Sequence, residues 1–189
     1  MARVQELEGL PEELPVFVGG FSNGGGFAPQ FADLMIEEGW DIRGALLHNT
    51  AGVMRDLPTA YVSSENDVKV STRSMRNAYE TTQAQGWESE LYEWNEIPVT
   101  AERLRVMETV DADEAQAIVE ELVTLGLIDE SGERLFDIAD LEPILRFYKN
   151  NTKQRGAART ERQLRVIWAT HRLSGFAASD EVDFLLRQL

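Results

Sequence analysis

The alternation of two sequence patterns over residues 15–97 most constrains the fold of this chain. Short runs rich in strand-forming residues occur at 15–20 (PVFVGG), 42–48 (IRGALLH), 59–64 (TAYVSS) and 89–94 (SELYEW). Between the first two runs, apolar residues recur at helical spacing: Phe27, Phe31, Leu34 and Met35. Strands that alternate with helices favour a parallel sheet with helices on its faces. We therefore expect an α/β fold with about four parallel strands.

Residues 98–165 carry helical patterns without a convincing strand. Thr100 can cap one helix, and Asp111 with Glu114 fits the capping box of a second. Residues 118–137 also resemble the helix and turn of a winged-helix module. Because the chain is strongly acidic, we interpret this segment as an internal packing unit rather than a DNA reader.

A last amphipathic helix is expected to begin at Ser179, with Val182, Leu185 and Leu186 packed against the core. The sequence thus predicts three parts. These are a partial α/β core over 1–97, a helical insertion or lid over 98–165, and a segment over 166–189 that completes the core.

Charge and composition exclude several classes of function. The net charge is −15, and nucleic-acid binding needs clustered cations that neutralise phosphates, so no nucleic-acid partner is expected. The absence of cysteine excludes disulfides and a thiolate nucleophile. No window is apolar enough to span a membrane, and the N-terminus lacks an export pattern, so a cytoplasmic location without a membrane partner is expected. Neither a cofactor nor a metal is expected.

The stretch VFVGGFSNGGGFAPQF at 16–31 places a serine within a glycine-rich turn. Gly20, Ser22 and Gly24 form a G-x-S-x-G pattern between a predicted strand and a predicted helix, which is the context of a nucleophile elbow. The two glycines are expected to let the helix pack close to the strand. The N–H of Asn23, at the positive end of the helix, would stabilise negative charge on a bound acyl oxygen. The alternative is a glycine-rich turn with an incidental serine, or a phosphate-binding loop.

The elbow resembles that of the α/β-hydrolase family, and the resemblance covers about residues 5–97 and 166–189. It implies a partial α/β-hydrolase sheet and a serine esterase whose triad follows the chain order serine, acid, histidine. Asp67, in the turn after TAYVSS, lies where the family's acid does, and Glu65 is the fallback.

The chain has two histidines from which to choose the base. His48 ends a predicted strand but precedes Asp67, which breaks the family's order. His171 lies ahead of the last helix, as in the family's histidine loop, and is therefore the predicted base. A surface or capping role for His171 is the alternative.

The chain departs from the family's pattern at two points. About seventy residues of helix separate SELYEW from His171, and the N-terminal half of the family's sheet is missing, with its second oxyanion N–H. The elbow strand would also be an open apolar edge. We therefore expect association through this edge, with a second copy or with a missing N-terminal polypeptide.

Two functions from different classes follow from these residues. The first is a serine hydrolase acting on a small-molecule ester, with Ser22 as nucleophile, His171 as base, Asp67 orienting the imidazole and Asn23 N–H in the oxyanion hole. The second is a catalytically impaired, hydrolase-like interaction module that binds a partner through its open sheet edge or its acidic helical segment.

Overall fold

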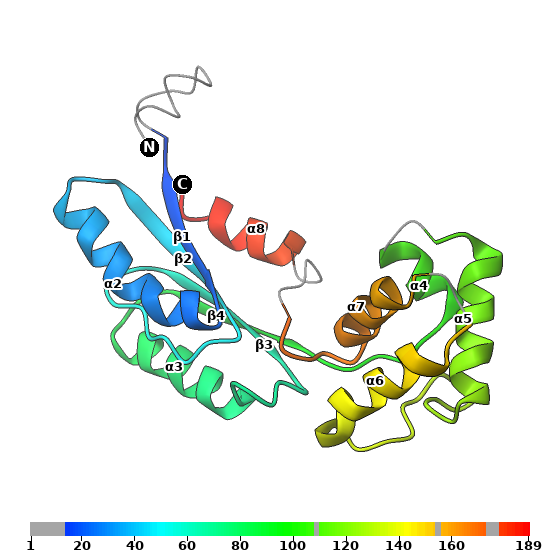
Figure 1. Ribbon diagram of the computed structural model, residues 1–189. Helices are drawn as coiled ribbons and strands as arrows, with labels where there is room; N and C mark the ends of the chain where they lie inside the picture. Colours follow the sequence, from blue (N-terminus) through cyan, green and yellow to red (C-terminus); the bar gives the residue numbers. More distant parts are fainter. Residues whose placement is uncertain (1–13, 108–109, 154–155, 173–177) are drawn as a thin grey trace. The chain divides into compact units, whose positions relative to one another are not determined.

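The structure is a computed structural model that describes residues 14–107, 110–153, 156–172 and 178–189. The described chain divides into two compact units (Figure 1). The first contains residues 14–63, 70–93 and 178–189, and the second contains 64–69 and most of 94–172. The helical unit thus begins at Trp94 and includes residues 166–172, which the sequence boundaries place with the core.

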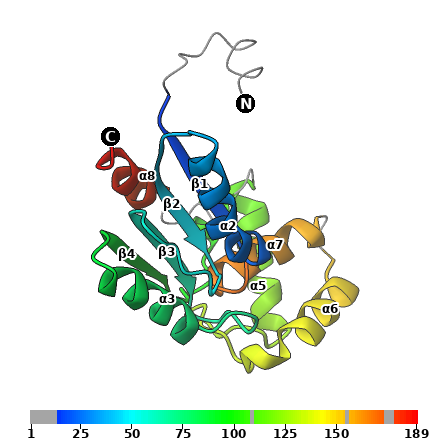
Figure 2. The ribbon, with the colours of Figure 1, turned by 90° about the vertical axis from the view of Figure 1, so that its left-hand side faces the viewer.

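A four-stranded parallel sheet forms the first unit, as the alternating pattern predicts (Figures 1 and 2). Its strands lie in the order β1 (Val16–Phe21), β2 (Ile42–His48), β3 (Thr59–Ser64) and β4 (Ser89–Trp94). In the register, Phe21 lies opposite His48, and His48 lies opposite Val62. Because the strands are parallel, the carboxyl ends of β1, β2 and β3 meet at one edge of the sheet.

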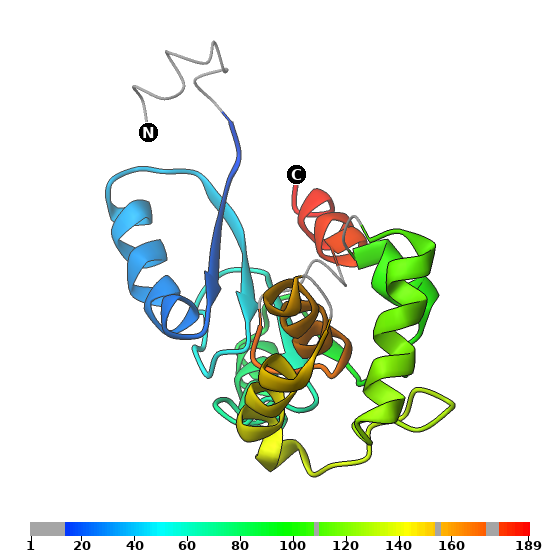
Figure 3. The same ribbon diagram turned by 45° about the vertical axis from the view of Figure 1, so that its right-hand side comes forward.

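Helices cover both faces of this sheet. The helices α2 (Asn23–Glu37) and α3 (Thr72–Ala84) share one core with alternate strand residues such as Leu47 and Tyr61. The helix α8 (Ala178–Leu186) contacts β2, and Figures 1 and 3 show it on the opposite face from α2. Since side chains alternate along a strand, Leu47 points toward α2 while His48 points toward α8.

The small residues of α2, rather than its large apolar residues, face the sheet. The buried residues of α2 are Gly25, Ala28 and Ala32. Three of the four larger apolar residues that recur at helical spacing are exposed instead: Phe27 by 61%, Phe31 by 41% and Leu34 by 52%. The start of α2 lies so close to β1 that only small side chains fit between them, as the glycine contacts described below show.

The buried face of α8 also differs from the prediction. Phe184 and Glu181 are buried, whereas Val182 is 51% and Leu186 56% exposed, and Leu185 is half-buried. Acidic residues ordinarily face solvent. Glu181 instead faces the sheet because it pairs with His48.

The second unit is helical, as expected for residues 98–165. Its elements are α4 (Ala101–Met107), α5 (Ala112–Thr124), the 3-10 helix η1 (Ile138–Asp140), α6 (Leu141–Asn151) and α7 (Ala157–Ile167). Their apolar faces share one core around Trp168, Leu122 and Tyr148. An antiparallel bridge between Ile128 and Arg134 closes a short hairpin after α5.

The predicted helix caps are confirmed in this unit. The hydroxyl of Thr100 accepts a hydrogen bond from the N–H of Arg103 at 3.3 Å, and the carboxylate of Asp111 accepts one from the N–H of Glu114 at 2.7 Å. These side chains satisfy N–H groups that the first turn of a helix leaves without partners. Throughout the described ranges, no helix combines the length and the apolar character that crossing a membrane requires.

Candidate active site

Ser22 occupies a strained turn between β1 and α2. Its backbone has φ 55° and ψ −122°, a combination that a residue with a side chain rarely adopts. The N–H of Ser22 donates to the carbonyl of His48 at 3.0 Å, and its own carbonyl accepts from the N–H of Gly26 at 3.1 Å. Hydrogen bonds on both sides therefore hold the strained serine at the carboxyl end of the sheet, as the G-x-S-x-G pattern predicts.

The glycines around Ser22 do not share one role. A Cβ on Gly20 would lie 2.5 Å from the backbone of Gly25, so the expected role of Gly20 in close packing is confirmed. The same expectation for Gly24 is wrong, since a Cβ there would meet nothing within 4 Å. Gly25 is the second tight position, because its Cβ would lie 2.4 Å from the side chain of Thr50. Three consecutive glycines in the sequence gave no way to choose between Gly24 and Gly25.

Asn23 is the first residue of α2 and is exposed. The first N–H groups of a helix have no acceptor within the helix, and they lie at the positive end of the helix dipole. This position suits an N–H that stabilises an oxyanion, and the role of Asn23 stays a prediction.

Asp67 and His171 form a buried pair within the second unit. The Nδ1 atom of His171 lies 2.6 Å from Oδ2 of Asp67, and the two side chains are only 10% and 0% exposed. The other carboxylate oxygen, Oδ1, accepts the N–H of Lys69 at 2.8 Å. Since Nδ1 faces the carboxylate, the ring position that can exchange a proton with a substrate is Nε2.

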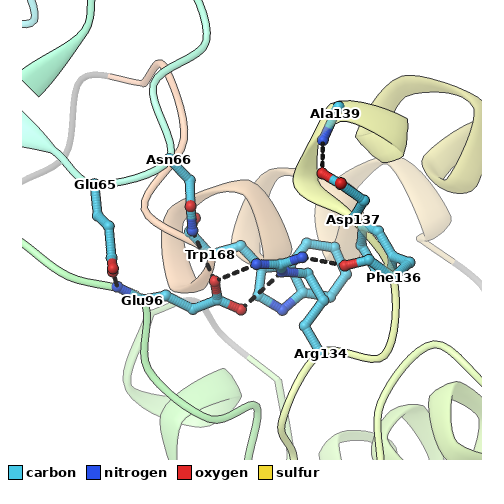
Figure 4. Close-up of polar contacts among 8 residues, drawn as sticks. All are labelled: Glu65, Asn66, Glu96, Arg134, Phe136, Asp137, Ala139 and Trp168. Carbon is cyan, nitrogen blue, oxygen red and sulfur yellow. Dashed lines mark hydrogen bonds and ion pairs between the residues drawn. The ribbon is translucent and has the colours of Figure 1, made fainter.

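Asn66 ties the turn of Asp67 to the segment of His171. Its N–H donates to the carbonyl of Ala169 at 3.0 Å, and its amide Nδ2 donates to the carbonyl of Trp168 at 3.0 Å. The same Nδ2 donates to Oε2 of Glu96 at 2.7 Å, and Arg134 binds both oxygens of Glu96 at 2.9 Å (Figure 4). The sequence analysis missed Asn66, Glu96 and Arg134, which lie far apart along the chain.

The fallback acid, Glu65, has another partner. Its carboxylate accepts the N–H of Glu96 at 2.8 Å (Figure 4). Glu65 therefore supports the turn, while Asp67 is the carboxylate that contacts the imidazole of His171.

His48 has a carboxylate of its own within the first unit. Its Nε2 lies 3.2 Å from Oε2 of Glu181, and both side chains are buried. Each of the two histidines thus pairs with a different acid, and the pairing that the chain order predicts, Asp67 with His171, is present.

The structure therefore brings two of the three predicted triad residues together. Ser22 belongs to the first unit, whereas Asp67 and His171 belong to the second, so the approach of Ser22 to His171 stays a prediction. Among the residues described, no cluster of three or more histidine, aspartate or glutamate side chains is placed to hold a metal ion.

Comparisons with protein-family models, with curated proteins and with solved structures give no match for this chain. The resemblance to α/β-hydrolases accordingly rests on the residues of the chain itself.

Proposed function

We propose that the chain is a serine hydrolase of the α/β-hydrolase type that cleaves carboxylic esters by acyl transfer. The observation that carries the proposal is the buried contact of 2.6 Å between His171 and Asp67. A carboxylate on Nδ1 fixes the tautomer of an imidazole and stabilises its protonated form, which is the support that a general base needs. The strained turn of Ser22 supplies the second line of support.

In the proposed reaction, the Oγ of Ser22 attacks the ester carbonyl carbon while Nε2 of His171 takes the hydroxyl proton. The carbonyl electron pair moves onto oxygen, where the N–H of Asn23 stabilises it. The tetrahedral intermediate then collapses, the bond to the alcohol oxygen breaks, and His171 returns the proton to the leaving alcohol. Water activated by the same histidine hydrolyses the acyl-serine and regenerates Ser22.

Chain connectivity supports the participation of Ser22. Ser22 directly follows β1, and Asp67 comes three residues after Ser64, the last residue of β3. Because parallel strands end at the same edge of a sheet, both segments leave the sheet at that edge. We therefore propose that Ser22 and the Asp67–His171 pair act as one triad.

Labelling with a fluorophosphonate probe tests this proposal. We expect the probe to modify Ser22, no adduct to form in Ser22→Ala, and labelling to slow about 10²–10⁴-fold in His171→Ala, in line with the loss of a general base. His48→Gln is the matched histidine control and is expected to retain labelling. Unchanged labelling in Ser22→Ala, or loss in His48→Gln with retention in His171→Ala, would overturn the assignment.

A second candidate function is an interaction module with a reactive serine but little turnover. In the proposed site the elbow supplies one N–H donor to the oxyanion, that of Asn23. The oxyanion hole of such enzymes has a second N–H donor. An adduct at Ser22 without steady-state hydrolysis of short p-nitrophenyl esters would favour this candidate. The expected cytoplasmic location stays part of the proposal in either case.

A further inference from the structure

β1 is an edge strand of the sheet formed by the described residues. The N–H groups of Val16 and Ser22 donate toward the β2 side, to the carbonyls of Asp41 and His48. Backbone direction alternates along a strand, so the N–H and C=O groups of Phe17 and Gly19 point away from β2. These groups form a row that another strand can pair with.

An apolar stripe on α2 lies on the side of this edge. The opposite flank of α2, with Gly26, Pro29 and Asp33, lines a hollow together with residues 52, 53 and 55 of the loop between β2 and β3. Phe27, Phe31 and Leu34 are on the other flank, toward β1. The ring centroids of Phe27 and Phe31 lie 6.1 Å apart, so these two side chains are neighbours in the stripe.

The helix on the other face repeats this arrangement. One flank of α8 lies against β4, where the hydroxyl of Tyr92 donates to the carbonyl of Asp180 at 3.2 Å and Arg187 pairs with Glu90. Val182, on the flank away from β4, is exposed, and so is Leu189 just beyond the helix. Exposed apolar side chains thus flank the β1 edge on both faces of the sheet.

We propose that the β1 edge, with these two flanks, is the interface of a homodimer. A two-fold axis perpendicular to the sheet pairs β1 with β1 of a second copy in antiparallel orientation and keeps each face on its own side. The α2 stripe then meets the α2 stripe of the second copy, and α8 meets α8. Such an interface is self-complementary, as closed two-fold dimers require.

The available surface lies at the lower end of the range that specific protein–protein interfaces bury. A buried aromatic side chain contributes about 150–250 Å². From the exposures above, the apolar side chains on both flanks and the edge backbone offer about 600 Å² per copy, which approaches the roughly 800 Å² per partner of a standard interface. Each chain carries a net charge of −15, so repulsion opposes pairing at low ionic strength and added salt screens it.

Sedimentation equilibrium of the purified chain across a series of salt concentrations tests the proposal. We expect a monomer–dimer equilibrium whose dissociation constant falls as salt rises. Phe31→Glu, which places a charge in the α2 stripe, is expected to weaken the dimer at least 10-fold. Phe147→Glu is the matched control, because Phe147 is 44% exposed on α6 of the second unit while Phe31 is 41% exposed, and it should leave the equilibrium unchanged.

Gly19→Pro provides an independent test through the backbone. It removes an N–H that points away from β2, and proline is tolerated on edge strands, so the chain should stay folded by circular dichroism while the dimer weakens. A compact monomer at every salt concentration would overturn the proposal. So would open-ended oligomers, or a dimer that neither Phe31→Glu nor Gly19→Pro weakens.

Discussion

The side-chain amide of Asn66 donates to the carbonyl of Trp168 at 3.0 Å, beside the contact between Asp67 and His171. The turn that contains Asp67 and the segment that contains His171 therefore meet at two neighbouring contacts. The contact of Asn66 is structural, and the contact between Asp67 and His171 has the chemistry of a general base. Ala169, whose carbonyl accepts the N–H of Asn66, has φ 46°, in the left-handed region. Asn66 thus holds a strained backbone turn two residues before His171.

We predict that Asn66 is a positioning residue for the proposed base. Asn66→Ala removes the side-chain contacts to Trp168 and Glu96, so His171 should lose its fixed orientation and ester hydrolysis should slow on the order of 10- to 100-fold. The apparent pKa in the kcat/KM profile should also move, which a purely structural effect would not cause. Asn150→Ala, at an exposed position on α6, is the control. An unchanged pH profile in Asn66→Ala would contradict this role.

The strain at Ser22 predicts that glycine at this position gives a more stable chain than alanine does. Glycine adopts positive φ without a steric cost, whereas alanine retains the strain. Ser22→Gly should therefore be more stable than Ser22→Ala by about 1 kcal/mol, part of the 1–3 kcal/mol typical of such backbone strain. Both variants lack the hydroxyl, so the comparison isolates the backbone. Denaturant unfolding measures the difference, and equal stabilities would show that the turn is relaxed.

The glycine contacts predict opposite effects at Gly20 and Gly24. Gly20→Ala places a Cβ 2.5 Å from backbone atoms of Gly25, and such overpacking typically costs about 1–3 kcal/mol. Gly24→Ala meets nothing within 4 Å, and alanine favours the helix over glycine by about 0.5–1 kcal/mol. The midpoint temperature of unfolding should therefore be lower in Gly20→Ala and unchanged or higher in Gly24→Ala. Comparable losses in both variants would refute the assigned contacts.

Features that depend on local sequence were predictable. The four strands follow from short β-type runs, and Gly39, Gly86 and Gly126, each just after a helix, have φ between 67° and 87°, where glycine is the favoured residue. The partnership of Asp67 with His171 followed from the triad order that the family resemblance implies, and the contact is present.

Contacts between elements, such as the face that a helix turns to the sheet, were not predictable from the sequence. On α2, Gly25, Ala28 and Ala32 form a stripe at helical spacing just as the larger apolar residues do, and periodicity cannot tell which stripe faces the sheet. The close approach of Gly20 to Gly25 decides in favour of the small residues. Asn66 reaches Glu96 across 30 positions of sequence, and no local pattern marks a contact at that separation.

An ion-pair network around Arg165 gives the second unit a pH-dependent stability. Arg165 donates to both oxygens of Glu142, at 2.7 and 2.8 Å, and to Glu161 at 3.0 Å. The hydrogen bonds from Arg165 lower the pKa of Glu142. Burial acts to raise the pKa of Glu161, but hydrogen bonds from Lys149 and Arg165 outweigh burial and lower it.

Because both folded-state pKa values lie below the ordinary 4.5, this stabilisation is present above pH 4.5 and is lost as pH falls through the folded values. Arg165→Met should lower the free energy of unfolding by about 1–2 kcal/mol near pH 7, allowing for the exposure of Glu142. The difference in unfolding free energy from the parent chain should close as pH falls below 4.5 and through the lowered folded-state pKa values. Denaturant unfolding at several pH values measures the gap, with Arg146→Met at an exposed position of α6 as control. A gap that stays constant down to low pH would mean that Arg165 stabilises the unit through packing of its side chain rather than through its charge.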